Sequence, residues 1–364
     1  MKWQPLYTLR SRQVLSITLF WVITGFFIET LNAINYDPLS HRYFFFFIFG
    51  NNAWEHLLIT ATGPLLGGLV WGTFIVFYQR EKLRGRTYAR KLLVHSALYL
   101  FFLSTCILFV GLIGALFTKG GSTYWNNFYN DIFSLRVLRL FIAWYFVVIA
   151  TVFLLDVSEK YGPGTLLKIL QGKYHSPGRE QRIFMFLDLR SSTSIAERIG
   201  DEKYFRMLHF FFKVANEAIL NSYGEIYQYV GDEIVISWKR DTGLRNANCL
   251  RCFHAVENAV ERHADYFNRE FGVVPSFKAG VHTGWVVTGE IGQVKKDLVY
   301  SGDVLNTTAR IVALCNSYGQ DLLVSDAIYA PLKDTPGLEF KYMGQPELKG
   351  KQAQTGLYGV LTRR

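Results

Sequence analysis

The hydrophobic positions divide the chain into an apolar first half and an alternating second half. In the first half, four long segments carry no more than one charge each: Val14–Ile34 with Glu29 inside it, Leu57–Tyr78, Leu92–Phe117, and Val137–Leu155 with Arg139 near its start. About 20 apolar residues cross a bilayer as a helix. The pattern therefore predicts a domain of four transmembrane helices over residues 1–155, with the lipid bilayer as its partner.

Two features near the N-terminus have alternative interpretations. The first apolar segment resembles a signal peptide, but it is longer than a usual signal core and no small-residue cleavage site follows it, so we interpret it as a retained span. Phe44–Phe49 is apolar but short. It fits an aromatic belt at the membrane surface, with a re-entrant segment as the alternative.

Charges in the loops predict the orientation of the spans. Residues 80–91 contain six Lys or Arg against the single acid Glu81, and the N-terminus carries Lys2, Arg10 and Arg12. Because positive residues stay on the cytoplasmic side, both termini are expected in the cytoplasm of a multi-pass protein of the cell inner (plasma) membrane. A nucleic-acid surface is the other explanation for the net charge of +10. The basic run lies between two spans, so we expect no nucleic-acid partner.

The second half alternates between short apolar runs and helical periodicity, which predicts an α/β ferredoxin-like domain over residues 181–364. Residues 156–180, rich in Gly and Pro, form the expected linker, with one or two helical turns inside it. The expected strands are Ile183–Leu187, Ile226–Val230, Ile234–Trp238, Ser276–His282, Leu322–Val324 and Phe340–Tyr342. The expected helices are Ser191–Asn221, Leu244–Phe271 and one that starts after Gly302.

Two acids lie at strand ends. Asp188 follows the apolar run Ile183–Leu187, and Asp232 lies in the tight turn between the strands of the predicted hairpin. A desolvated carboxylate needs a partner, and a metal ion is a natural one. Two such acids side by side suggest a two-metal site for phosphoryl transfer. The alternative is a pair of aspartates that cap turns in an unrelated α/β domain.

Four motifs in order resemble the class III nucleotidyl (adenylate/guanylate) cyclases, of the membrane-anchored bacterial type. They are Phe186-Leu187-Asp188, Gly231-Asp232, the Asn306–Arg310 pair, and the block Lys278–Gly284. The resemblance runs from about Arg182 to about Val360. Four motifs in the family's order and spacing make a stronger signal than any one of them.

The resemblance implies conversion of ATP to 3′,5′-cyclic AMP and pyrophosphate, at sites shared across a homodimer. Asp188 and Asp232 are the implied ligands of two Mg²⁺ or Mn²⁺ ions, with the Leu189 carbonyl as a further ligand. Asn306 is implied to orient the ribose and Arg310 to stabilise charge at the α-phosphate, both from the partner subunit.

Further residues are candidates for binding the triphosphate. The turn Arg190, Ser191, Ser192 and Thr193 offers backbone amides at a helix start, although an ordinary Ser/Thr cap is the alternative. Lys278, Lys349 and Lys351 match basic positions of the family. Surface salt bridges are an equally good explanation for these three lysines.

The base-reading pair departs from the family. Familiar adenylate cyclases have lysine and aspartate, and guanylate cyclases glutamate and cysteine, where this chain has Gln228 and Val299. A Gln amide can donate or accept, whereas Val offers no hydrogen bond. ATP is the default substrate, and GTP or relaxed specificity is the alternative. A membrane receptor with an inactive cyclase-like dimerisation domain is the alternative from another class.

The cysteines and histidines do not form a convincing metal site. Cys249 and Cys252 are a lone CxxC in a helical pattern, which predicts two helix thiols rather than a zinc or redox site. His41, His56 and His95 are scattered without ligand spacing. No metal or haem role is assigned to them.

Overall fold

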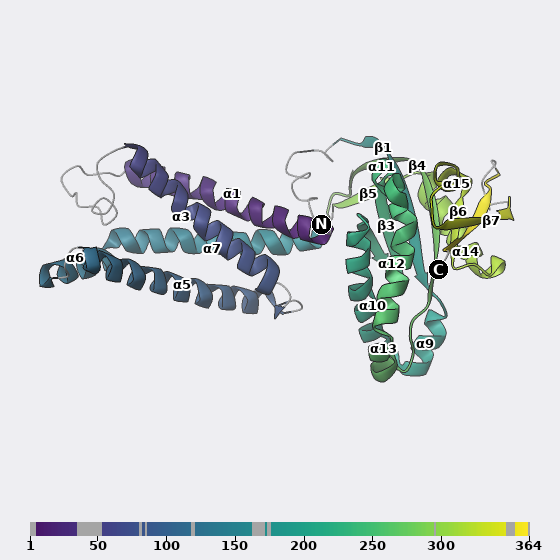
Figure 1. Cartoon of the computed structure of the whole chain (residues 1–364), viewed down its shortest axis with the longest axis horizontal. Coiled ribbons are helices and arrows are strands. Elements are labelled where there is room, and N and C mark those ends of the chain that lie inside the picture. The colour runs from purple at the N-terminus through teal and green to yellow at the C-terminus, as the bar shows by residue number, and fades with distance from the viewer. Residues whose placement is uncertain are drawn as a thin grey trace. The chain divides into compact units, whose positions relative to one another are not determined.

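The computed structural model describes residues 5–34, 53–79, 82–83, 86–117, 121–161, 172, 176–294, 296–346 and 354–362. The chain divides into two compact units: a helical one over Tyr7–Pro163, and a second that contains the sheet and comprises Gly164–Arg364 together with Met1–Leu6 (Figure 1). The expected helical turns in the linker, the segment Phe44–Phe49, and His41 lie outside the described residues. The predicted combination of an apolar helical half with an α/β half is confirmed.

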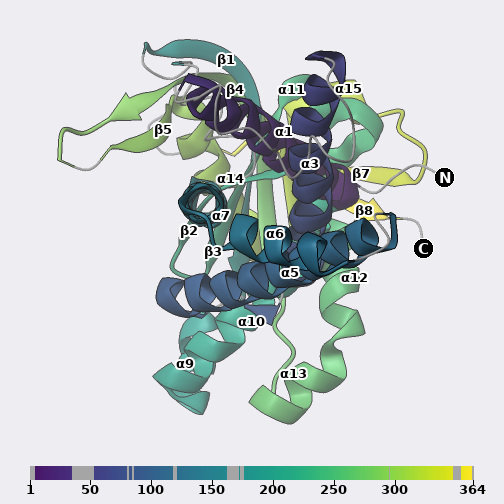
Figure 2. The same ribbon diagram turned by 90° about the vertical axis from the view of Figure 1, so that its left-hand side faces the viewer.

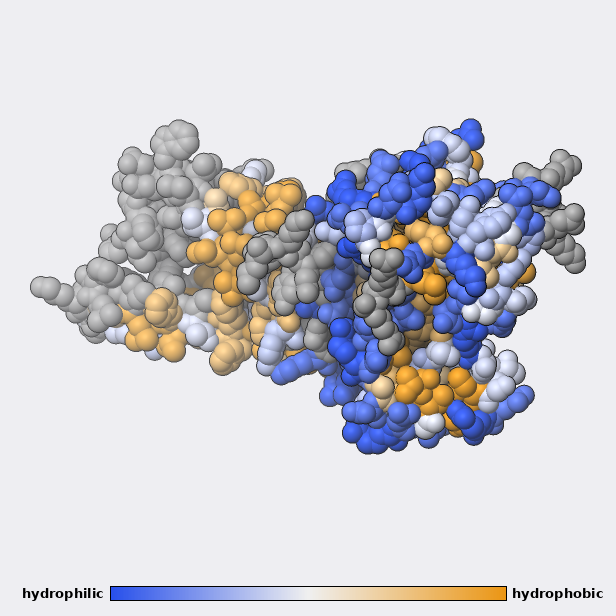
Figure 3. Space-filling view, turned by 45° about the vertical axis from the view of Figure 1, so that its right-hand side comes forward, coloured by the Kyte–Doolittle hydropathy of each residue, from blue (hydrophilic) through white to orange (hydrophobic). Residues whose placement is uncertain are grey.

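Among the described residues of the helical unit, four helices are long and apolar enough to cross a membrane. They are α1 (Pro5–Ile34), α3 (Ala53–Thr73) with its π-helical continuation η2 (Phe74–Gln79), α5 (Tyr88–Phe117) and α7 (Leu135–Tyr161). Apolar side chains point outward from them, as at Phe101 (73% exposed), and hydrophobic residues predominate on the part of this unit that Figure 3 draws in colour. Such an outer surface suits a lipid environment. The short helix α6 (Ser122–Ile132) was not predicted.

Inside the helical unit, polar contacts join helices that are distant in sequence. The Trp21 indole donates to Thr151 Oγ1 at 3.0 Å, and Lys91 Nζ lies 2.6 Å from Asp156 Oδ1. The first contact joins α1 to α7 and the second joins α5 to α7. In an apolar surrounding such paired polar groups hold helices in register, because separating them would leave each without a partner.

The second unit is built on an eight-stranded sheet. Seven strands follow the order β2-β3-β1-β4-β6-β8-β7, and β5 pairs with β4. β1 is antiparallel to both neighbours, and β4 is parallel to β6. The strands are β1 (Gly178–Leu189), β2 (Glu225–Val230), β3 (Glu233–Lys239), β4 (Phe277–Ile291), β5 (Asp297–Ser301), β6 (Leu322–Ser325), β7 (Leu338–Gly344) and β8 (Leu357–Thr362).

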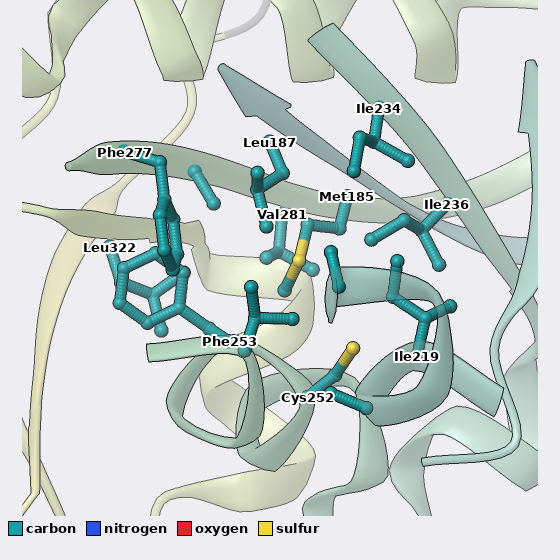
Figure 4. Packing of buried hydrophobic residues seen from close by; sticks show 14 of the residues in the cluster. Met185, Leu187, Ile219, Ile234, Ile236, Cys252, Phe253, Phe277, Val281 and Leu322 are labelled. Carbon is teal, nitrogen blue, oxygen red and sulfur yellow. The ribbon is translucent and has the colours of Figure 1, made fainter. Parts of the chain in front are cut away.

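Alternate residues of β1 serve two different faces. Ile183, Met185 and Leu187 pack into the main core under α10 (Asp201–Asn221), α12 (Asn248–Arg262) and α13 (Ala264–Phe271) (Figures 1 and 4). Phe184 and Phe186 belong to a second cluster on the opposite face, together with residues of α14 (Asp303–Tyr318). Asp188 continues this second series, so it lies on the α14 face of the sheet.

The helices after the first and third strands are shorter than expected. The predicted helix Ser191–Asn221 is two helices, α9 (Ser192–Ile199) and α10, because Gly200 adopts φ 82° between them. The predicted helix Leu244–Phe271 is α11 (Arg240–Leu244), a 3₁₀ turn (Arg245–Ala247), α12 and α13. Positive φ at Asn246 and Ala247 interrupts the helical backbone there.

The later part of the sheet is more extensive than expected. β4 continues nine residues past the predicted end at His282 and pairs with β5, which was not predicted, and Figure 2 shows the two as an arm. Nor were α15 (Asp326–Leu332) and β8 predicted. The arm is stabilised by backbone hydrogen bonds between β4 and β5. Many of its side chains are exposed, such as Trp285 (51%) and Ile291 (59%), so its sequence lacks the buried apolar pattern that predicts a strand.

Candidate active site

Three charged residues form a row across three neighbouring strands. Asp188 on β1 is opposite Glu233 on β3 and opposite Lys278 on β4. Cross-strand partners present their side chains on the same face, so all three lie on the α14 side of the sheet. Lys278 Nζ is 3.3 Å from Asp188 Oδ2. Asp232 occupies the turn between β2 and β3, directly before Glu233.

The carboxylates of this row repel one another. Burial raises the pKa of Asp188, Asp232 raises it further, and Lys278 opposes the increase. Burial and the same two aspartates raise the pKa of Glu233 to about 7. The row and the adjacent Asp232 together contain three acids and one lysine, so this part of the site attracts cations.

The donor set fits a hard divalent ion, because carboxylate oxygens are the ligands that Mg²⁺ and Mn²⁺ prefer. Within the described ranges, no three Asp, Glu, His or Cys side chains are close enough together to hold a metal by themselves. The remaining ligands must therefore come from backbone, water or substrate. Leu189 lies next to Asp188 at the end of β1, where it is buried and pairs with Phe277.

The turn after β1 is held by its first residue. The Arg190 amide donates to Ser276 O at 2.9 Å, and its guanidinium donates to Asn316 Oδ1 and Asp321 Oδ1, each at 2.6 Å. Both the amide and the guanidinium of Arg190 are therefore hydrogen-bonded within the domain, so its position does not support the expected role in binding phosphate. The contacts anchor the turn against the start of β4 and the end of α14.

The next three residues begin α9. Ser191 has φ 55° and makes no side-chain cap hydrogen bond, so the alternative of an ordinary serine cap does not describe this turn. Ser192 is half-buried and hydrogen-bonds to the side chain of Tyr204, whereas Thr193 is exposed. The Tyr204 phenol, whose pKa is raised by burial and by Asp232, is a site residue that the sequence did not reveal. Its spacing on α10 is that of an ordinary core aromatic.

α14 carries the second set of candidate residues. Asn306 is exposed and Arg310 is half-buried, with its Nη1 atom buried and without a hydrogen-bond partner in the part of the chain that the structure describes. The helix lies close against β4 because Gly280 has no side chain. A Cβ on Gly280 would lie 2.5 Å from Val312 N and 3.0 Å from Thr308 O.

The two sets make no direct polar contact with one another among the described residues. In the described ranges, no hydrogen bond or ion pair joins Asn306 or Arg310 to Asp188 or Asp232. The structure thus brings together the acids and Lys278, and separately places Asn306 and Arg310 on one helix.

The two base-reading positions are on β2 and β5. A register shift between Ile226 and Gln228 brings Gln228 opposite Val235, a member of the cluster on the α14 face. A bulge of this kind redirects a side chain without ending the strand. Gln228 is therefore exposed on the face that carries Asp188. Val299 is half-buried on β5 and pairs with Gly289.

The remaining predicted residues are not seen at this site or lie outside the described part of the chain. Lys349 and Lys351 lie outside the described residues, as does the side chain of His56. His95 is buried within the helical unit. Cys249 and Cys252 are fully buried on α12, and burial raises the pKa of each thiol to about 12, in agreement with two unreactive helix thiols.

Comparison with known proteins gives a consistent result. The family model of the adenylate and guanylate cyclase catalytic domain matches residues 176–360. The chain is 36% identical to adenylate cyclase 2 of Rhizobium meliloti over 200 residues, 55% of each protein, and 25% identical to an adenylate cyclase of Anabaena cylindrica over 57% of this chain and 43% of that one.

Comparison of the fold with solved structures also finds cyclases. The structure of a bacterial light-regulated adenylyl cyclase superposes with a TM-score of 0.52 at 18% identity, over 62% of this chain and 65% of that one. The chain spans about half the length, or less, of the curated relatives named above. The family model covers just over half of the residues, and the chain belongs to the family of the adenylate and guanylate cyclase catalytic domain.

Proposed function

We propose that the protein is a membrane-bound adenylate cyclase that converts ATP to 3′,5′-cyclic AMP and pyrophosphate. The observation that carries this proposal is that Asp188, at the end of β1, and Asp232, in the β2–β3 turn, repel each other. Lys278 contacts Asp188. Two half-buried acids with one lysine destabilise the domain unless a cation binds. The names of the bacterial relatives support the choice of reaction.

In this proposal Asp188 and Asp232 hold two Mg²⁺ or Mn²⁺ ions, with the Leu189 carbonyl as a further ligand. Bound there, divalent ions would supply acidification of the ribose 3′-hydroxyl and neutralisation of the leaving pyrophosphate. The remaining work of the protein is to position the 3′-oxygen in line with the α-phosphorus. Lys278 and the amides of Ser191, Ser192 and Thr193 bind the triphosphate, and Lys349 and Lys351 are further candidates.

The second half of each site comes from the partner in a homodimer. Asn306 orients the ribose, and Arg310 stabilises the charge that develops at the α-phosphate. The support is that Arg310 Nη1 is buried without a hydrogen-bond partner in the described chain. In the same residues, no hydrogen bond or ion pair joins Asn306 or Arg310 to Asp188 or Asp232. A symmetric pairing of two chains would build two complete sites.

The substrate is ATP, with GTP as the alternative. Gln228 is compatible with either nucleotide, because it is exposed on the α14 face and its amide can present either a donor or an acceptor to the base. Val299 adds no polar group to exclude the wrong purine.

The helical unit anchors the enzyme in the inner membrane. Its four apolar helices and the basic segment between the second and third support both termini on the cytoplasmic side, where the nucleotide is found.

Purified full-length protein in detergent tests the proposal. Incubation with ATP or GTP, each with Mg²⁺ or Mn²⁺, is followed by chromatography of the cyclic nucleotide. We expect cyclic AMP from the wild type and none from the Asp188→Ala variant. Absence of both cyclic nucleotides from a folded, dimeric wild type would favour the receptor with an inactive domain.

A further inference from the structure

A buried arginine, Arg182, contacts residues of β2 and β5, the strands that carry the candidate base-reading residues Gln228 and Val299. Arg182 on β1 is 1% exposed. Its guanidinium donates to Glu225 Oε2 at 2.7 Å, Glu180 Oε1 at 3.2 Å and Ser237 Oγ at 3.3 Å. Thr288 Oγ1 on β4 donates to the same Glu180 oxygen at 2.9 Å. Arg182 and the two glutamates that it contacts therefore join four strands, β1 to β4.

The cluster also contacts β5, the strand that pairs with β4. The Arg182 guanidinium lies over the Tyr300 ring, with its Cζ 4.9 Å from the ring centroid. Tyr300 in turn packs against Tyr227 of β2, with ring centroids 4.9 Å apart, and both rings contact Phe184 edge-on. A cation over an aromatic face is attracted most strongly when both are desolvated, as here. The separation between β2 and β5 is thus set by a rigid stack.

The stack brings a hydroxyl group next to Val299. The backbone amide of Tyr300 donates to the Tyr227 hydroxyl at 3.3 Å. Val299 directly precedes that amide, and Gln228 directly follows Tyr227 in sequence. A phenol oxygen that accepts one hydrogen bond still carries a proton that it can donate. Tyr227 is half-buried, so part of its side chain is reachable from outside.

We propose that Tyr227 contacts the purine base and supplies the hydrogen-bond donor that Val299 lacks, and that Arg182 is the positioning residue that holds Tyr227 in place through Tyr300. The proposal rests on the cyclase function proposed above. The acceptors it would meet are adenine N1 or guanine O6. Because both purines offer an acceptor, Tyr227 strengthens binding of the base without selecting between ATP and GTP.

The test separates binding of the base from binding of the phosphates. The Tyr227→Phe variant keeps the aromatic stack and removes only the hydroxyl. We expect it to raise the KM for ATP about three- to tenfold, the effect of one neutral hydrogen bond, with a smaller change in kcat. The competitive inhibition constant of inorganic tripolyphosphate, measured with Mn²⁺ in excess, should stay unchanged because this probe has no base.

Two further variants complete the design. Tyr229→Phe is the matched control, because Tyr229 is two residues along β2 and its hydroxyl bonds to Asn216 of α10 at 2.7 Å. It should change neither constant. Arg182→Lys keeps the buried charge but loses the planar fork, so it should raise the KM for ATP as Tyr227→Phe does. Melting temperatures establish that each variant is folded.

The outcomes are distinguishable. If Tyr227→Phe leaves the KM for ATP unchanged, or if the KM and the tripolyphosphate constant rise together, Tyr227 does not read the base and the inference is wrong. If the folded wild type makes no cyclic nucleotide, the proposed function itself fails. Binding of ATP and tripolyphosphate, measured by calorimetry, then tests the Tyr227 contact independently of turnover.

Discussion

Lys278 is the cross-strand partner of Asp188, and its ammonium group is 3.3 Å from the carboxylate. The lysine side chain is 12% and the aspartate side chain 28% exposed, so the pair is shielded from much of the solvent. Lys278 therefore compensates part of the acid charge before any metal or nucleotide binds. In the proposed cyclase the same ammonium group would also bind the triphosphate.

Removal of either candidate metal acid should abolish turnover and leave the fold intact. Asp188→Ala or Asp232→Ala deletes a carboxylate ligand and also relieves repulsion among the three acids. We expect kcat to fall by at least on the order of a hundredfold, while the melting temperature of the metal-free protein stays equal or rises. Activity near that of the wild type at saturating Mn²⁺ would contradict the two-metal assignment.

Mixed dimers should recover activity. When Asp188→Ala and Arg310→Ala are co-expressed, random pairing makes half of the dimers mixed, and each mixed dimer keeps one intact site. We expect up to about a quarter of the wild-type activity, although each variant alone is inactive. Differently tagged chains allow the mixed dimers to be isolated by tandem purification. No activity in this fraction would mean that each site is built within one protomer.

The metal-free protein should lose stability as the pH rises between 4.5 and 7. The pKa of Glu233 is raised from 4.5 to about 7, first by burial and then by Asp188 and Asp232. Below pH 4.5 the acid is protonated in both the folded and the unfolded state and costs nothing. Between the two values the folded state holds the proton more tightly, so the free energy of unfolding falls with pH, by up to about 3 kcal/mol above pH 7.

Melting temperatures recorded across this pH range, with and without Mg²⁺, check that expectation. The Glu233→Gln variant cannot ionise at this position and should show a flatter pH profile. Glu261→Gln, at an exposed position of α12, serves as the matched control. A wild-type profile as flat as that of Glu233→Gln would show that Glu233 is not destabilised in the folded protein.

The wild type should discriminate weakly between ATP and GTP. A site with a buried polar group rejects the wrong base because that group is left unpaired, at about 1–3 kcal/mol, and Val299 carries no such penalty. Changing Gln228→Lys together with Val299→Asp should raise the ratio of kcat/KM for ATP to that for GTP, roughly five- to a hundredfold. If the wild type already prefers ATP by several orders of magnitude, other groups read the base.

A methyl group on Gly280 should disturb the α14 half of the site. The added Cβ of Gly280→Ala would meet Val312 N at 2.5 Å and Thr308 O at 3.0 Å, both backbone atoms that cannot rotate away. We expect α14 to shift, with a loss of about 1–3 kcal/mol in unfolding free energy and a lower kcat because Arg310 moves with the helix. Gly178→Ala, which has open space around it, is the control. Equal melting temperatures for the two variants would mean that the contact is not rigid.

The sequence alone was sufficient for the features that depend on local pattern. Long uncharged segments can be stable only in lipid or a large core, so the four apolar helices followed from their length. The apolar run before Asp188 and the turn at Asp232 marked strand ends, because a buried strand and a tight turn have local signatures. The spacing of Asn306 and Arg310 placed both on one helix face in the same way, whereas their candidate roles came from the resemblance to the cyclase family.

The tertiary structure decided what depends on pairing between distant segments. The register opposite Asp188 determines that Glu233 and Lys278 share its face, and the bulge before Gln228 determines which face that residue occupies. Neither is encoded within a single strand, because a slip of one residue would reverse every side chain.

Pairing between distant segments also explains why the sequence did not reveal Arg182 and Tyr204 as residues near the site. Arg182 reads as a surface cation at the start of a strand, yet it is almost fully buried, because Glu225 and Tyr300 approach it from strands more than 40 residues away. Tyr204 reads as a core aromatic until the break at Gly200 turns α10 and brings its phenol to Ser192. A charge or hydroxyl can be buried only where distant partners satisfy it, and only the folded chain shows those partners.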